Sequence, residues 1–207
     1  MPKLRSIAAL VFTATLLSAC ERNPLLVRRS VCPAVGVANF TGDVTLFNPT
    51  ESRDARAIDV VASITGLRNV CTEGAATIGN TVTFDVVARR ASTGGARTVV
   101  LPFFASVVQG GNTLVSKQVG QVTLQFADGQ LRTKTSGAAT ATVARSAATL
   151  KADVQNKISR RRKAGDLDAA TDPLADPEIK AAVRAVSFEV LVGFQLDEAQ
   201  LGYNVLK

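Results

Sequence analysis

The sequence predicts a mainly β protein: an immunoglobulin- or fibronectin-like β-sandwich followed by a C-terminal helical extension. From Val31 to about Val143, apolar and polar residues alternate with period two, as strands with one buried face require. Glycine pairs and one Asp-Gly dipeptide divide this region into about seven short strands. After Val143 the apolar spacing becomes helical. A small closed barrel is the alternative architecture for the β region.

Two segments show the alternation most clearly, and each predicts a strand with one face in the core. Their expected core-facing residues are Ile58, Val60, Ala62 and Ile64 in the first and Val82, Phe84, Val86 and Ala88 in the second. The run from Thr98 to Val108 is apolar on both faces, which predicts a strand covered on both sides. Pro102 cannot donate a backbone hydrogen bond, so we expect an edge or a bulge there.

The segment from Val122 to Thr135 predicts a hairpin. Asp128-Gly129 suits a two-residue type I′ turn, in which both central residues have positive φ. Phe126 would then lie opposite Leu131 in one sheet.

Helical spacing begins with Ala147, Leu150, Val154 and Ile158, which predict a helix packing one face on the sandwich. The sequence Asp176-Pro177-Glu178 predicts a second helix start, because it combines an N-cap, a proline in the first turn and an acid. Residues 179–194 fit both a helix and a strand, and we favour a helix with Gly193 as its cap. A last short helix is expected from Asp197.

The first nineteen residues have the features of an export signal. Lys3 and Arg5 precede an apolar stretch from Ile7 to Leu17, which is shorter than the about 20 residues that span a membrane. The stretch ends in Leu17-Ser18-Ala19-Cys20, which resembles the lipobox of bacterial lipoprotein precursors. The resemblance implies cleavage before Cys20 and lipid attachment to its sulfur. An ordinary secretory signal that contains a cysteine is the alternative.

The resemblance also implies a location. Glu21 follows Cys20, where lipoproteins retained at the inner membrane typically carry Asp, so we expect the periplasmic face of the outer membrane. The mature region loosely resembles uncharacterised periplasmic lipoproteins of Gram-negative bacteria, which supplies no activity and no site residues. The expected division is a signal peptide at 1–19, a lipid-attached tether at 20–31, a sandwich domain at 32–145 and a mostly helical extension at 146–207.

Two cysteines remain after Cys20. In an oxidising compartment an even pair predicts a structural disulfide, Cys32–Cys71. A redox-active pair would have Cys-x-x-Cys spacing, which the chain lacks.

The charge of the C-terminal region is strongly uneven. Residues 145–163 hold seven basic side chains against one acid and end in a run of four cations, Arg160, Arg161, Arg162 and Lys163. This run is a possible contact for an anionic partner such as lipid headgroups or an acidic protein, or else a solvated helix end whose cations complement the helix dipole. The following loop is acidic, and Asp166 and Asp168 form a weak calcium candidate. The simpler interpretation is that this loop pairs with the preceding arginines.

Composition narrows the function. The chain has 24 basic and 17 acidic residues and no histidine, so histidine-dependent catalysis and His-ligated metals are excluded. We expect no enzyme, no cofactor and, because the chain is exported, no nucleic-acid partner. The leading hypothesis is a lipid-anchored binding or accessory module that holds an envelope protein. The alternatives are a lipid or glycan carrier with a cavity lined by Phe103, Phe104 and Phe126, and a hydrolase that uses acids alone.

Overall fold

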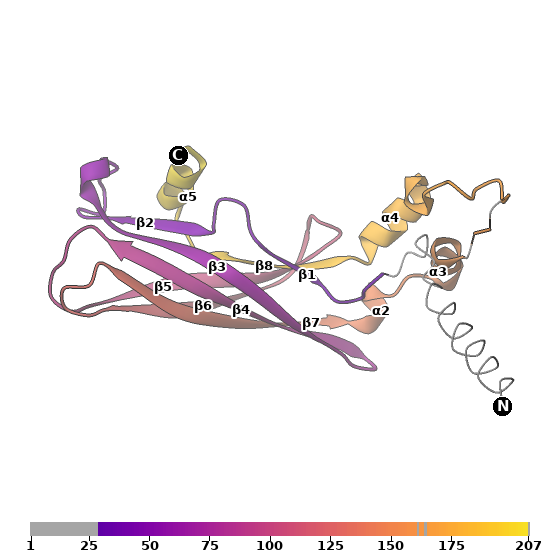
Figure 1. Cartoon of the computed structure of the whole chain (residues 1–207), viewed down its shortest axis with the longest axis horizontal. Helices are drawn as coiled ribbons and strands as arrows, with labels where there is room; N and C mark the ends of the chain where they lie inside the picture. Colours follow the sequence, from indigo (N-terminus) through magenta and orange to yellow (C-terminus); the bar gives the residue numbers. More distant parts are fainter. Residues whose placement is uncertain (1–28, 161, 164, 207) are drawn as a thin grey trace, which may run out of the picture.

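A computed structural model describes residues 29–160, 162–163 and 165–206. The predicted signal peptide at 1–19, Cys20, most of the tether and Arg161 lie outside the described residues. The described chain is mainly β, with two sheets and helices concentrated toward its C-terminal end (Figure 1).

Each sheet has four strands. The first, called here sheet A, has the order β1-β8-β5-β6, and the second, sheet B, has the order β2-β3-β4-β7. Their bounds are Ala34–Val37 (β1), Asp43–Phe47 (β2), Ile58–Glu73 (β3), Thr77–Arg90 (β4), Arg97–Gln109 (β5), Thr113–Phe126 (β6), Arg132–Ala144 (β7) and Phe188–Phe194 (β8). Neighbouring strands are antiparallel, except that β1 is parallel to β8.

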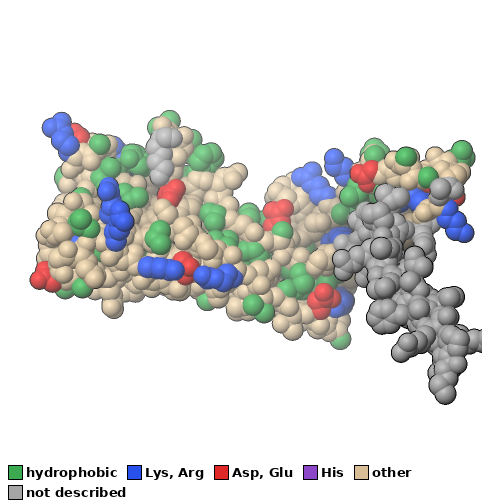
Figure 2. Space-filling model, viewed as in Figure 1, with side chains coloured by type: hydrophobic (Ala, Val, Ile, Leu, Met, Phe, Trp, Pro, Cys, Tyr) green, Lys and Arg blue, Asp and Glu red, His purple; other side chains and the backbone are tan. Residues whose placement is uncertain are grey.

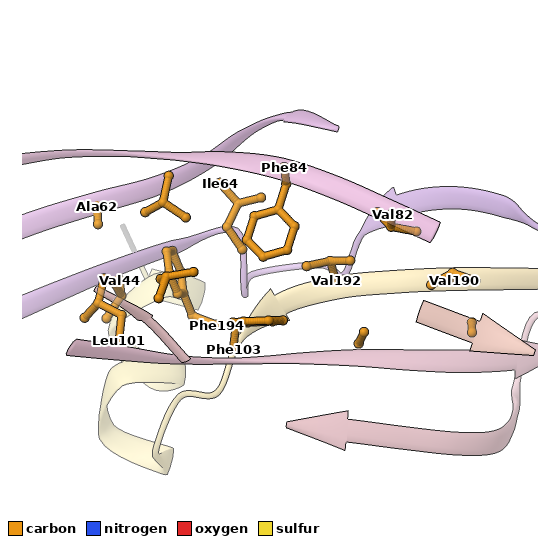
Figure 3. Packing of buried hydrophobic residues seen from close by; sticks show 14 of the residues in the cluster. Val44, Ala62, Ile64, Val82, Phe84, Leu101, Phe103, Val190, Val192 and Phe194 are labelled. Atoms are coloured by element: carbon orange, nitrogen blue, oxygen red, sulfur yellow. The ribbon is translucent and has the colours of Figure 1, made fainter. Parts of the chain in front are cut away.

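The inner faces of the two sheets form one hydrophobic core (Figure 3). Phe84 of β4 meets Phe103 of β5 edge to face, with ring centroids 5.1 Å apart. Seven of the eight residues expected to face the core are buried, and Ile58 is half-buried. This confirms the period-two prediction for β3 and β4. Phe126 and Phe194 are also fully buried.

The predicted hairpin is wrong. β6 belongs to sheet A and β7 to sheet B, so the 127–131 turn carries the chain from one sheet to the other. Gly129 has a φ of 72°, but Asp128 does not have positive φ, so the turn is not type I′. An Asp-Gly dipeptide predicts a chain reversal, whereas the sheet that each flanking strand joins depends on distant partners.

Pro102 lies in a central strand, between β6 and β8, rather than at an edge. Its carbonyl accepts from Gln195 N, at the point where β8 has just ended. The nitrogen of Pro102 therefore faces the side where β8 has already ended, so β5 loses no strand-to-strand hydrogen bond there. The β5–β6 register shifts instead between Val107 and Val108, opposite the extra residue Val115 of β6.

The region after Ala144 differs from the predicted extension in two ways. The helix expected through Ala147 and Ile158 is broken into α2 (Arg145–Ala148) and α3 (Ala152–Ser159). Leu150, Ile158 and Ile179 form a second, smaller hydrophobic cluster. With α4 (Pro177–Ala185), α3 thus makes a separate helical lobe at one end of the sandwich, instead of packing along it (Figure 1).

The helix favoured for residues 179–194 is wrong over its second half. α4 starts as predicted, with the Asp176 carboxylate accepting from Glu178 N, but it ends at Ala185. Residues 188–194 form β8, between β1 and β5. As a strand, this segment buries four alternating apolar side chains between the sheets. The sandwich therefore extends beyond the predicted boundary at residue 145.

A last helix, α5 (Glu198–Leu206), packs beside β2 near the predicted start at Asp197. Tyr203 meets Phe47 edge to face at 5.2 Å, and Asn204 Nδ2 donates to the carbonyls of Phe40 and Asp43, each at 2.8 Å.

A buried arginine organises the end of the sandwich far from the helical lobe. Arg90 is 4% exposed, and its guanidinium donates to four backbone carbonyls from two loops. The acceptors are Gly94 (2.8 Å), Gly95 (2.8 Å), Ala127 (3.1 Å) and Gln130 (2.6 Å). The guanidinium also lies 5.3 Å from the centre of the Phe126 ring.

Candidate binding groove

The outer face of sheet B brings together cations that are far apart in the sequence. Pairing across β3, β4 and β7 sets Val61, Arg89 and Arg132 in one row. The next row on the same face is Ser63, Val87 and Lys134. Lysine and arginine side chains are spread over this face of the sandwich in Figure 2, whereas the core lies beneath it.

A groove of about 740 Å³ runs across these two rows and is open to solvent. Its lining consists of Val61, Ser63, Val87, Ala88, Arg89, Arg132, Thr133 and Lys134. We call this site the basic groove. Its floor is largely apolar and its cations stand on β4 and β7, so it can hold an anionic group together with an attached apolar portion.

Asp85 neutralises one cation of the basic groove, Lys134, and also contacts Arg68 outside the groove. Its carboxylate lies 3.1 Å from Lys134 Nζ and 2.9 Å from Arg68 Nη2, and it accepts from Ser136 Oγ at 3.0 Å. The hydrogen bond from Lys134, then those from Ser136 and Arg68, hold the pKa of Asp85 below its ordinary value. Asp85 therefore stays ionised at neutral pH, and one negative charge serves two cations.

Arg89 and Arg132 are different, because no carboxylate within the described residues forms a salt bridge with either. They are directly opposite each other on neighbouring strands. Like charges in this position destabilise a sheet. A bound carboxylate or phosphate would offset the repulsion between the two guanidiniums. Each guanidinium also offers two parallel donors to such a group.

Two members of the cationic run predicted as a contact for an anionic partner, Arg160 and Arg162, pair with carboxylates of their own chain. Arg160 contacts Asp168 closely, and Arg162 Nε lies 3.4 Å from the same carboxylate. The hydrogen bond from Arg160 is the main cause of the lowered pKa of Asp168. Lys163 is exposed and its backbone N–H donates to Asp166, and Arg161 lies outside the described residues.

Asp166 and Asp168, the weak calcium candidate, both face this run. Asp166 lies 3.8 Å from Arg160 Nη1, so the two acids pair with the preceding arginines as the simpler interpretation expected. Among the residues that the structure describes, no group of three or more acidic, cysteine or histidine side chains could hold a metal ion.

The predicted disulfide joins Cys32 to Cys71 in β3. Arg29, which precedes Cys32 in the chain, contacts the helical end of the molecule. Its guanidinium donates to the carbonyls of Ala148 (2.9 Å) and Val186 (2.6 Å). Partial burial lowers the pKa of Arg29. Cys20, the predicted lipid attachment site, precedes the described residues.

The three phenylalanines expected to line the cavity of a ligand carrier lie on different faces of sheet A. Phe103 and Phe126 are buried in the core, while Phe104 lies on the outer face of sheet A with Lys117 Nζ 4.8 Å from its ring centre. These three side chains do not line one cavity.

Sequence reasoning missed the basic groove. Arg89 and Arg132 are separated by 43 positions, and only strand pairing brings them together. The available signal was the alternation in β4, which assigns Arg89 and Arg90 to opposite faces.

Comparisons of the chain with family models, curated proteins and solved structures find no match to any of them. No helix in the described part of the chain is long and apolar enough to cross a membrane.

Proposed function

We propose that this protein is a lipid-anchored module of the bacterial envelope that binds an acidic partner protein through the basic groove. The observation that carries the proposal is the cross-strand pair Arg89 and Arg132, which have no carboxylate partner in the described chain. Sequence features support the anchor: the signal-like leader and the lipobox at Leu17–Cys20, with Glu21 favouring the outer membrane. The finer immunoglobulin- or fibronectin-like assignment is part of the proposal, supported by two sheets that share one core.

The position of Arg29 supports an orientation. Nine positions separate it from Cys20, so a lipid on Cys20 would keep Arg29 within about 30 Å of the membrane. Arg29 contacts the ends of α2 and α4, which supports an orientation with the helical lobe nearest the lipid. From Lys134 to Ala144, β7 runs for about 33 Å before α2 begins. The basic groove would therefore face a partner at a distance from the bilayer.

The shape of the groove favours a protein over an enclosed small molecule. A small-molecule site typically buries 70–90% of its ligand, whereas the basic groove is an open trough on a sheet face. An acidic surface with a short apolar segment complements both its arginines and its valines.

Crosslinking in intact cells tests the proposal. A photo-reactive residue at Val87, in the full-length lipoprotein, should trap one envelope protein, which mass spectrometry identifies. Arg89→Ser combined with Arg132→Ser should reduce the trapped amount at least tenfold. Arg53→Ser combined with Arg56→Ser is the matched control, because both residues are on the surface outside the groove, and it should leave trapping unchanged.

Equal trapping by both double variants would refute the role of the groove. The anchor is tested separately by mass spectrometry of the N-terminal peptide, which should carry lipid on Cys20. An unmodified cysteine, or cleavage at another position, would refute the anchor without affecting the groove.

A further inference from the structure

The four strand edges of the sandwich differ in how well they are protected. β1 has only four residues, and β2 has α5 packed beside it. β7 carries mainly Thr, Ala and Ser, with no large apolar side chain exposed. β6 is fourteen residues long and exposes Leu114, Val115 and Val119, which are 60%, 52% and 62% accessible.

Within the described chain, the backbone of β6 has a strand partner on one side only. Thr133 Oγ1 donates to the Gln125 carbonyl at 2.6 Å, so the polar groups of Gln125 point away from β5 and toward the edge. Backbone direction alternates along a strand, so the N–H and C=O groups of Lys117, Val119, Gln121 and Thr123 point the same way. β6 pairs with β5 alone among the described strands, and these groups therefore have no strand partner.

Natural proteins usually block such an edge with prolines, several charges, a bulge or a covering element. β6 has no proline and one charge, Lys117, and its bulge at Val115 lies outside the stretch from Lys117 to Thr123. That charge is not free to guard the edge, because its Nζ is held over the ring of Phe104 on the adjacent strand. An unpaired row of N–H and C=O groups, flanked by apolar side chains, matches another extended polypeptide.

We propose that β6, from Leu114 to Thr123, receives an extended segment of a second protein as a fifth strand of sheet A. The backbone groups of Lys117, Val119, Gln121 and Thr123 bind the segment, and Leu114, Val115 and Val119 select apolar side chains in it. This edge is separate from the basic groove, which lies on the outer face of sheet B.

A second copy of the chain fits less well than a partner protein. Antiparallel pairing of β6 with β6 of another copy would reverse the long axis, because the strands run along the molecule (Figure 1). The two helical lobes would then lie at opposite ends. With Cys20 as the proposed anchor, two copies in one membrane would hold their lobes at the same end.

Hydrogen exchange of the full-length protein in detergent micelles tests the proposal. The probe is a peptide of about twelve alternating valines and threonines with a lysine at each end, and the control probe is the same peptide with alternate amides N-methylated. The unmodified peptide should slow exchange of the Val119 and Gln121 amides at least tenfold, whereas the methylated peptide should not.

Three variants make the test specific. Val119→Lys adds a charge at the edge, and Val119→Pro removes an outward N–H that β5 does not use, so each should lower peptide affinity at least tenfold. Val100→Lys is the matched control, because Val100 is 50% exposed but lies on β5, which has a strand on each side. This variant should bind the peptide normally. Far-UV circular dichroism establishes that each variant is folded.

Equal binding of the methylated peptide, or unchanged binding by both Val119 variants, would overturn the proposal. A dimer without peptide, with the 117–123 amides protected, would also overturn it in favour of a second copy. The Arg89→Ser and Arg132→Ser variant should bind the peptide normally, so failure of the groove is distinguishable from failure of the edge.

Discussion

Replacement of the buried Arg90 by methionine tests how the loop end of the sandwich is held together. Methionine fills a similar volume but donates no hydrogen bond, so four carbonyls lose the bond from Arg90. The carbonyls of Gly94 and Ala127 keep backbone bonds from Gly129 N and Gln130 N. A hydrogen bond to a charged group contributes about 1.5–3 kcal/mol, but four bonds from one guanidinium do not add fully, and loop carbonyls can turn toward water. We therefore expect a loss of about 3 kcal/mol in the free energy of unfolding.

Urea unfolding followed by circular dichroism measures the loss. For a domain of this size, about 3 kcal/mol corresponds to a fall in Tm of about 6–12 °C. Arg90→Lys should be intermediate, because an ammonium has three donors and cannot match the planar fork of arginine. The matched control is Arg89→Met, one residue earlier on the outer face, which should be neutral or slightly stabilising because it relieves repulsion from Arg132.

Two results would refute this reasoning. A loss below about 1 kcal/mol for Arg90→Met would mean that the four bonds do not stabilise the loops relative to their hydrated state. Equal losses for Arg89→Met and Arg90→Met would mean that the burial and bonding of Arg90 are not the cause.

The remaining predictions concern a salt bridge, a close contact and the disulfide. The pKa of Asp85 is lowered in the folded state, so its stabilising effect is present above its unfolded pKa and is lost as the pH falls through the folded value; Asp85→Asn should flatten the dependence of Tm on pH in that acidic range. Gly137→Ala should lower stability by about 2 kcal/mol in urea unfolding, because its Cβ would overlap the Phe84 ring. Cys32→Ser with Cys71→Ser should cost about 4 kcal/mol in the same assay, because the closed loop has a sequence separation of 39.

Each of these has its own control. Gly94→Ala introduces a methyl group with no atom within 4 Å, so stability should change by less than about 0.5 kcal/mol. Reduced wild-type protein should unfold like the double serine variant, and a clear difference would show that the substitutions act beyond breaking the bond. An Asp85→Asn protein with the same acid sensitivity as wild type would assign that sensitivity to other carboxyl groups.

Local patterns in the sequence predicted the elements that depend on local causes. Alternation located β3 and β4, and the Asp176-Pro177 pair located the start of α4, because core-facing periodicity and capping are decided within a few residues. The apolar spacing of residues 188–194 fits both a helix and a strand. The segment is a strand because it pairs with β1 and β5, which are distant in the sequence.

The candidate site was beyond the reach of such patterns. A cationic run such as Arg160–Lys163 stands out in a sequence, but acids a few residues away pair with Arg160 and Arg162. Arg89 and Arg132 are inconspicuous singly and become a site only through the β4–β7 register. Local charge density is therefore a poor guide to where a β protein presents unpaired charge.

The disulfide has a mechanical consequence for a tethered protein. Tension that enters the described chain at its N-terminal end reaches Cys32 before it reaches β1. There it passes through a covalent bond to Cys71 in β3, one of the two middle strands of sheet B, so the short strand β1 is shielded from being peeled off β8. Since sheet B also carries the basic groove, a load between a lipid anchor and a bound partner would travel through one continuous sheet.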